Sequence, residues 1–214
     1  MTIRVLLADD HAVVRDGLRA LLELRGDIEV VGEACDGRLA VAEAIRLRPD
    51  IVLMDICMPN RNGIESTQLL RADSPSTKVI ILSMHSTFEH IFRALHAGAS
   101  GYVLKQSAGT EVVLAARSVH AGKRYLSPRV AEALLGDYVR EGKASSPLEA
   151  LSHREREILQ LIAEGKTSAE VGYMLSLSRK TVDTYRSRLM QKIGVGHVPG
   201  VVKFAIQHGL IDLQ

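Results

Sequence analysis

The chain has 214 residues, of which 46% are hydrophobic and 24% charged, and its formal net charge is +2. A single domain usually has about 100 to 150 residues, so this length favours two domains, and the composition excludes a wholly disordered chain. Because no run approaches the roughly 18 apolar residues of a membrane span and the first residues form no signal peptide, we expect a cytoplasmic protein with no membrane partner.

Residues 1–122 alternate short apolar runs with amphipathic segments. The runs are rich in β-branched residues and predict buried strands at residues 3–8, 28–34, 50–54, 78–82 and 101–104. Between them, apolar residues recur at helical spacing, as in Val14, Leu18 and Leu21. This alternation predicts an α/β domain with a doubly wound, five-stranded parallel sheet that is covered on both faces.

Residues 123–147 differ in character and predict a partly helical linker. Ser127 and Pro128 form a good helix N-cap and first helical position, so we expect a helix that runs to about Arg140. The following segment, residues 142–147 (GKASSP), is small, polar and ends in proline, as is typical of a domain boundary.

Residues 148–214 predict a second, smaller all-α domain of four helices. Ser152 with Glu155 and Thr167 with Glu170 form two capping boxes, and Ser178 caps a third helix. A fourth helix is expected over residues 198–208. The third helix is basic, since residues 178–192 contain five Lys and Arg against one Asp. Two helices joined by a short turn, the second of them basic, predict a helix-turn-helix that binds double-stranded DNA.

Acidic side chains follow the first and third predicted strands of the first domain. Asp9 and Asp10 follow the first strand and Asp55 the third, while Ser83 and Lys105 follow the fourth and fifth. The carboxyl ends of parallel strands share one edge of a sheet, so these side chains should converge. Three carboxylates predict a Mg²⁺ site, and a nucleophilic carboxylate beside a cation, a lysine and a hydroxyl suits phosphoryl transfer.

Over residues 1–125 the segments LLADDH, VLMDICMPNRNGIE, IILSMH and GASGYVLK resemble the motifs of response-regulator receiver domains. The resemblance implies a flavodoxin-like fold in which Asp55 accepts a phosphoryl group from a histidine kinase. It also implies that Asp9, Asp10, Asp55 and the backbone carbonyl of Cys57 bind Mg²⁺.

The same resemblance implies how the receiver switches. Lys105 pairs with the phosphoryl group, Ser83 moves toward it, and Tyr102 turns inward. One departure is Gln106, where many receivers have a cis proline. A cis non-proline bond costs about 2.5–4 kcal/mol, so we expect the loop after the fifth strand to have a trans bond or to be more mobile. We interpret His11 and His85 as residues at the rim of the pocket rather than as metal ligands.

From about residue 148 onward, the sequence is similar to the LuxR-type helix-turn-helix, and the whole chain resembles NarL/FixJ-type response regulators. This implies a transcription factor, rather than an enzyme, whose dimerisation and DNA binding are controlled by phosphorylation. One departure is Gly172, where alanine is usual, which should weaken the short second helix by about 1 kcal/mol.

The third helix carries the expected DNA contacts. Lys180, Asp183, Thr184 and Ser187 share one helix face that should enter the major groove and read bases, and Thr181 belongs to the same contact set. The flanking side chains suit phosphates, which fix register without reading sequence: Tyr185, Arg186, Arg188 and Lys192.

One such helix reads only a half-site, so we expect a homodimer when the protein is active. The fourth helix resembles the segment through which family members pair, and its expected pairing residues are Val201, Val202, Ala205 and Ile206. RNA polymerase is a further candidate partner.

Two alternative functions share some of these features. A Mg²⁺-dependent aspartyl-phosphate phosphatase would have the same carboxylates at its strand ends, but it needs a second Asp two residues after the nucleophile, where this chain has Cys57. A regulator whose N-terminal domain senses a small molecule would keep the DNA-binding domain. The strand–helix alternation that ends in Lys105 argues against it.

Overall fold

The computed structural model describes residues 2–141 and 147–211, which form two compact units, Met1–Gly142 and Lys143–Gln214. Most of the predicted linker segment GKASSP, residues 142–146, lies outside the described residues. No described helix is long and apolar enough to cross a membrane.

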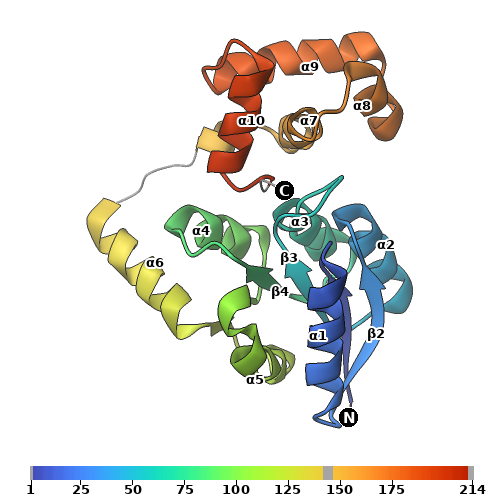
Figure 1. Ribbon diagram of the computed structural model, residues 1–214, viewed down its shortest axis with the longest axis vertical. Helices are drawn as coiled ribbons and strands as arrows, with labels where there is room; N and C mark the ends of the chain where they lie inside the picture. Colours follow the sequence, from blue (N-terminus) through green and yellow to red (C-terminus); the bar gives the residue numbers. More distant parts are fainter. Residues whose placement is uncertain (1, 142–146, 212–214) are drawn as a thin grey trace. The chain divides into compact units, whose positions relative to one another are not determined.

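The first unit is built on a parallel sheet (Figure 1). Its strands, in the spatial order β2-β1-β3-β4-β5-β6, are β2 (Ile28–Ala34), β1 (Ile3–Ala8), β3 (Ile51–Asp55), β4 (Lys78–Ser83), β5 (Gly101–Leu104) and β6 (Tyr125–Leu126). The doubly wound parallel fold is confirmed, but the sheet has six strands rather than five. The sixth strand was not predicted because it has only two residues, too few for a recognisable apolar run.

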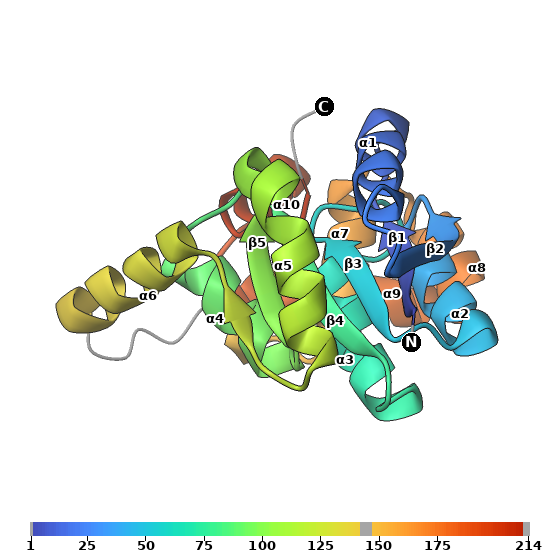
Figure 2. The ribbon, with the colours of Figure 1, turned by 90° about the horizontal axis from the view of Figure 1, so that it is seen from below.

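Helices cover both faces of the sheet (Figure 2). On one face, the side chains of α1 (Ala12–Glu23) and α5 (Ala108–His120) pack against β1, β3, β4 and β5. The other face is covered by α2 (Gly37–Leu47), α3 (Gly63–Asp73), α4 (Phe88–Ala97) and α6 (Pro128–Glu141). Val130 of α6 is fully buried there, so the first part of the segment expected to be a linker belongs to the first unit.

The second unit consists of helices around its own apolar core. After a short 3-10 turn (Pro147–Ala150) come α7 (His153–Ala163), α8 (Ser168–Leu175), α9 (Arg179–Lys192) and α10 (Val198–Gln207). Both predicted capping boxes form, at the N-termini of α7 and α8, and the Ser178 hydroxyl caps α9. These caps satisfy backbone N–H groups that the helices leave unpaired, so the local sequence determines where each helix begins.

Candidate functional site

The carboxyl ends of the central strands bring the predicted pocket residues together. Asp55 is the last residue of β3 and Ser83 the last of β4, whereas Asp9 follows β1 and Lys105 follows β5. Asp9, Asp55 and Ser83 are buried, and only 14% of the Lys105 side chain is exposed. The parallel register of β1, β3, β4 and β5 therefore places these side chains at one edge of the sheet.

Lys105 joins two of the carboxylates. Its Nζ lies 2.8 Å from Asp9 Oδ2 and 2.9 Å from Asp55 Oδ2. Burial acts to lower the pKa of Lys105, but Asp55 and Asp9 outweigh it and raise the pKa, so the side chain is charged at neutral pH. One ammonium thus faces three carboxylates, counting Asp10, and the pocket keeps an excess of negative charge.

Asp55 lies in an environment that perturbs its ionisation. Burial raises the pKa of Asp55 to about 6, the charge of Lys105 opposes that shift, and Asp9 reinforces it. The carboxylate oxygens are both engaged: Oδ1 accepts from the backbone N–H of Ile56 at 2.9 Å, and Oδ2 pairs with Lys105. These contacts fix the orientation of the Asp55 carboxylate at the carboxyl end of β3.

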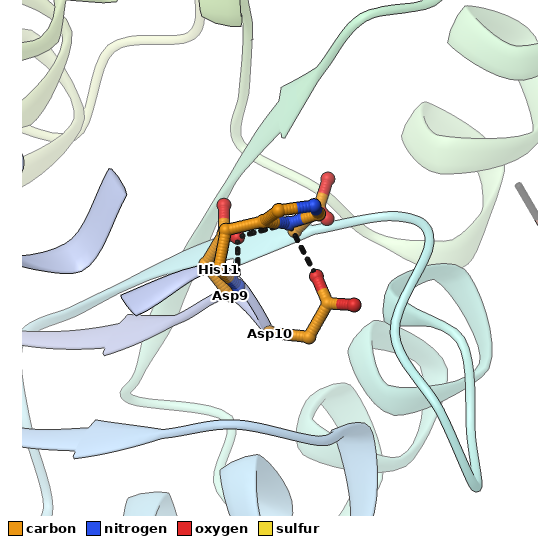
Figure 3. Close-up of side chains that lie close together, drawn as sticks. Asp9, Asp10 and His11 are labelled. Carbon is orange, nitrogen blue, oxygen red and sulfur yellow. Dashed lines mark hydrogen bonds and ion pairs between the residues drawn. The ribbon is translucent and has the colours of Figure 1, made fainter. Parts of the chain in front are cut away.

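His11 belongs to the same cluster (Figure 3). Its Nδ1 lies 2.7 Å from Asp10 Oδ1 and 3.2 Å from Asp9 Oδ1, and its backbone N–H donates to Asp9 Oδ1 at 2.9 Å. The side chain of His11 is 65% exposed, as a rim residue would be, but its ring is grouped with the three aspartates as a potential metal ligand, contrary to the interpretation from the sequence.

The donor atoms suit a divalent cation. One ligand atom from each of Asp9, Asp10, His11 and Asp55 lies within 4.8 Å of all the others. Mg²⁺ prefers hard oxygen donors such as carboxylates, and the three carboxylates here outnumber the single positive charge of Lys105. The residues present therefore fit that ion. Cys57, whose backbone carbonyl was the other predicted ligand, follows Asp55 by two residues in the β3–α3 loop.

The predicted switch residues Ser83 and Tyr102 both form hydrogen bonds with His85 in the loop after β4. The hydroxyl of Ser83 accepts a hydrogen bond from the backbone N–H of His85 at 3.0 Å, and the Tyr102 hydroxyl donates to the His85 carbonyl at 2.8 Å. Tyr102 is fully buried, which raises the pKa of its hydroxyl, although a hydrogen bond with Ser83 opposes the shift. The Tyr102 side chain is thus held in the interior beside the loop that follows β4.

Two smaller expectations concern the pocket's surroundings. The residues that the structure describes contain no cis peptide bond, so the bond before Gln106 is trans, the first of the two expected alternatives, and Lys105–Ser107 form a 3-10 turn. Cys57 forms no disulfide and is partly exposed, and its Sγ lies 3.7 Å from His85 Nε2.

The predicted base-reading face of α9 is exposed. Lys180, Asp183, Thr184 and Ser187 all lie at the surface, as does the expected phosphate contact Arg188. The hydroxyls of Thr184 and Ser187 donate to carbonyls one turn earlier in the helix, at 3.0 and 3.1 Å. Val182 and Leu189 on the opposite side are fully buried, so packing determines which face of α9 points outward.

Three of the remaining predicted contacts on α9, Thr181, Tyr185 and Lys192, have partners within the domain. Thr181 takes part in the Ser178 cap, Tyr185 packs on the core, and Arg186 is partly exposed. Lys192 Nζ lies 2.7 Å from Glu155 Oε2 in α7. Burial acts to raise the pKa of Glu155, but Lys192 and the Ser152 cap together lower it. Lys192 therefore ties α9 to α7, a role that the sequence did not reveal.

Gly172 of α8 lies against the turn between α8 and α9. A Cβ at this position would lie 2.7 Å from the backbone oxygen of Leu177, and the backbone N–H of Leu177 donates to the Gly172 carbonyl at 2.8 Å. Glycine therefore permits a close approach of two backbone segments, an effect that helix propensity does not describe.

The four residues expected to form a pairing surface on α10 differ in exposure. Val201 and Ala205 are fully buried in the core of the second unit, whereas Val202 and Ile206 are partly exposed. A pairing surface on α10 would thus be restricted to the side that carries Val202 and Ile206.

The first unit has a buried aspartate beside a lysine at the edge of a parallel sheet, and the second unit contains a helix-turn-helix. Together these features define a class of protein, the phosphorylation-controlled transcriptional regulators. Comparison with known proteins supports this class. Residues 5–117 match the response regulator receiver domain, and residues 149–205 match the bacterial regulatory proteins of the luxR family.

The chain aligns with curated relatives over nearly its whole length. The chain is 39% identical to the transcriptional regulatory protein MctR of Rhizobium johnstonii, over 98% of this chain and 96% of the relative. It is 35% identical to the oxygen regulatory protein NreC of Staphylococcus carnosus, over 98% of this chain and all of the relative. The solved complex of the response regulator RcsB with DNA aligns with a TM-score of 0.60 at 27% identity, covering 95% of this chain and 98% of that one. The chain belongs to the family of two-component response regulators with a LuxR-type DNA-binding domain.

Proposed function

We propose that Asp55 is the phosphoacceptor of this response regulator. The observation that carries this proposal is the position of Lys105, whose ammonium lies within 2.9 Å of both Asp9 and Asp55 at the ends of their strands. In this arrangement Asp55 is a nucleophile held in place, and Lys105 is a fixed positive charge for the oxygens of an incoming phosphoryl group.

The transfer conserves atoms and charge. A carboxylate oxygen of Asp55 forms a bond to phosphorus while the bond from phosphorus to the donor breaks, and the donor leaves with that electron pair. Asp9 and Asp10, with Asp55 and the Cys57 backbone carbonyl, would hold Mg²⁺, which neutralises charge on the transferring group when bound. Lys105 and Ser83 orient the phosphoryl oxygens. The physiological donor is a histidine kinase.

The output is sequence-specific DNA binding through α9. Its exposed polar face, with Lys180, Asp183 and Thr184, reads bases in the major groove, and Arg186 and Arg188 contact phosphates. Two copies read two half-sites, and α10 contributes Val202 and Ile206 to pairing. The receiver, residues 1–122, controls these events through the segment 123–147, and the chain acts as a regulator of RNA polymerase rather than as an enzyme.

Labelling with a small phosphodonor tests the phosphoacceptor. Incubation with acetyl phosphate and Mg²⁺ should add one phosphoryl group to the intact protein, detected by mass spectrometry, and removal of Mg²⁺ should abolish the addition. Asp55→Asn should not be labelled, whereas Asp50→Asn, which changes an aspartate at the opposite end of β3, should be labelled normally. Normal labelling of Asp55→Asn would refute the assignment.

A further inference from the structure

The imidazole of His11 is the one donor in the acidic cluster to which the proposed phosphoryl chemistry gives no role. It is joined to the cluster by its ring, since Nδ1 is close to one oxygen of Asp9 and one of Asp10 at once (Figure 3). The His11 side chain is 65% exposed and the Asp9 side chain 2% exposed, so the ring connects a buried carboxylate to the surface.

The spacing of these atoms matches that of neighbouring ligands around one ion. In octahedral coordination with bonds of about 2.1 Å, adjacent donor atoms are about 3.0 Å apart. The Nδ1 atom of His11 lies 2.7 Å from Asp10 Oδ1 and 3.2 Å from Asp9 Oδ1, which brackets this value. A cation could therefore take the place of a proton between the ring and the two carboxylates.

Lys105 does not compete for the same atoms. Its Nζ contacts Oδ2 of Asp9, while His11 contacts Oδ1 of that residue. The two oxygens of Asp9 thus face two different cationic sites, one filled by the ammonium and the other bordered by Asp10 and His11. An ion on the His11 side leaves the pair between Lys105 and Asp55 intact.

We infer that His11 is a nitrogen ligand in this pocket, so that the site binds transition-metal ions such as Co²⁺ more tightly than Mg²⁺. The inference rests on the proposed function, because it concerns the same cation site. An imidazole favours the later divalent metals, whose affinity for nitrogen rises along the first transition series, whereas Mg²⁺ prefers oxygen. His11 therefore determines metal preference rather than phosphoryl transfer.

Isothermal titration of the full-length protein with CoCl₂ and with MgCl₂ tests this role. The variant His11→Asn is suited to the purpose because its amide can still donate to the carboxylates but supplies no imidazole nitrogen. We expect this variant to weaken Co²⁺ binding by at least about tenfold and to change Mg²⁺ binding little. Tenfold is the lower end of the loss in metal affinity that usually follows removal of a residue supporting a metal site. The control His120→Asn, at the exposed end of α5, should bind both ions like the wild type.

A spectroscopic measurement detects the nitrogen directly. Electron spin echo modulation of protein loaded with one equivalent of Mn²⁺ should show coupling to a histidine nitrogen in the wild type and in His120→Asn, but not in His11→Asn. Absence of that coupling in the wild type, or equal Co²⁺ affinity of His11→Asn and wild type, would overturn the inference and leave His11 as a hydrogen-bond donor. Phosphorylation of the wild type with Mg²⁺ is unaffected by either result, so failure of the proposed function would be seen separately.

Discussion

Replacement of Gly172 by alanine tests how the helix-turn-helix is held together. Helix propensity alone predicts that Gly172→Ala stabilises α8 by about 1 kcal/mol. The added Cβ, however, would lie 2.7 Å from the backbone oxygen of Leu177, and neither backbone can move without disturbing the turn. Forcing an extra methyl group into a packed site costs about 1–3 kcal/mol, so we expect a net loss of stability of up to about 2 kcal/mol.

A matched variant separates packing from propensity. Gly17 lies on the exposed side of α1, and a Cβ there would meet nothing within 4 Å, so Gly17→Ala should stabilise its helix by about 1 kcal/mol. Hydrogen exchange of the intact protein, followed by mass spectrometry, should show faster exchange in α8 for Gly172→Ala and slower exchange in α1 for Gly17→Ala. Slower exchange in α8 of Gly172→Ala would refute the role assigned to the close approach at Leu177.

The remaining predictions concern the ionisation of Asp55 and the different roles of the DNA-contacting residues on α9. Burial raises the pKa of Asp55 to about 6. In metal-free protein, the NMR signal of its carboxyl carbon should therefore shift with a midpoint near pH 6, as the group loses its proton on raising the pH. Addition of Mg²⁺ should move this midpoint to lower pH. A midpoint near 4 without metal would contradict the burial argument. On α9, Lys180→Ala should cost about 1–3 kcal/mol on the best site and relax base preference at one position, whereas Arg188→Ala should weaken binding to all sequences alike. Selection of binding sites from random DNA with both variants checks this, and an equal loss of base preference in the two would show that the roles are misassigned.

Most of the receiver fold could be predicted because its signals are local. Each of the five longer strands contains adjacent apolar residues, and parallel strands must place Asp9 and Asp55 at the same edge of the sheet. The second unit was predictable for a similar reason, since Ser152 and Thr167 mark helix starts by a short-range hydrogen bond.

The features that escaped prediction depend on contacts between distant segments. The pair between Lys192 and Glu155 joins residues 37 positions apart, and nothing in the local sequence distinguishes Lys192 from a lysine available to DNA. Burial of Val201 and Ala205 depends on how α10 packs on α7. The close approach at Gly172 likewise depends on the path of the turn, which helix propensity does not describe.

Phosphorylation is expected to act at a distance from DNA. A phosphoryl group adds nearly two negative charges, which would repel DNA if it lay near α9, so the effect must pass through a conformational equilibrium. Ser83 and Tyr102 both bond to His85, which makes the loop after β4 the element that this equilibrium would shift.

The affinity of the intact protein for a selected DNA site, measured with and without acetyl phosphate, tests this account most directly. We predict that phosphorylation raises the affinity by about 5-fold to 150-fold, the usual range of coupling between two sites, and that Asp55→Asn shows no such response. Ser83→Ala should be labelled but respond less. Equal affinity of the labelled and unlabelled wild-type protein would contradict control of DNA binding by Asp55.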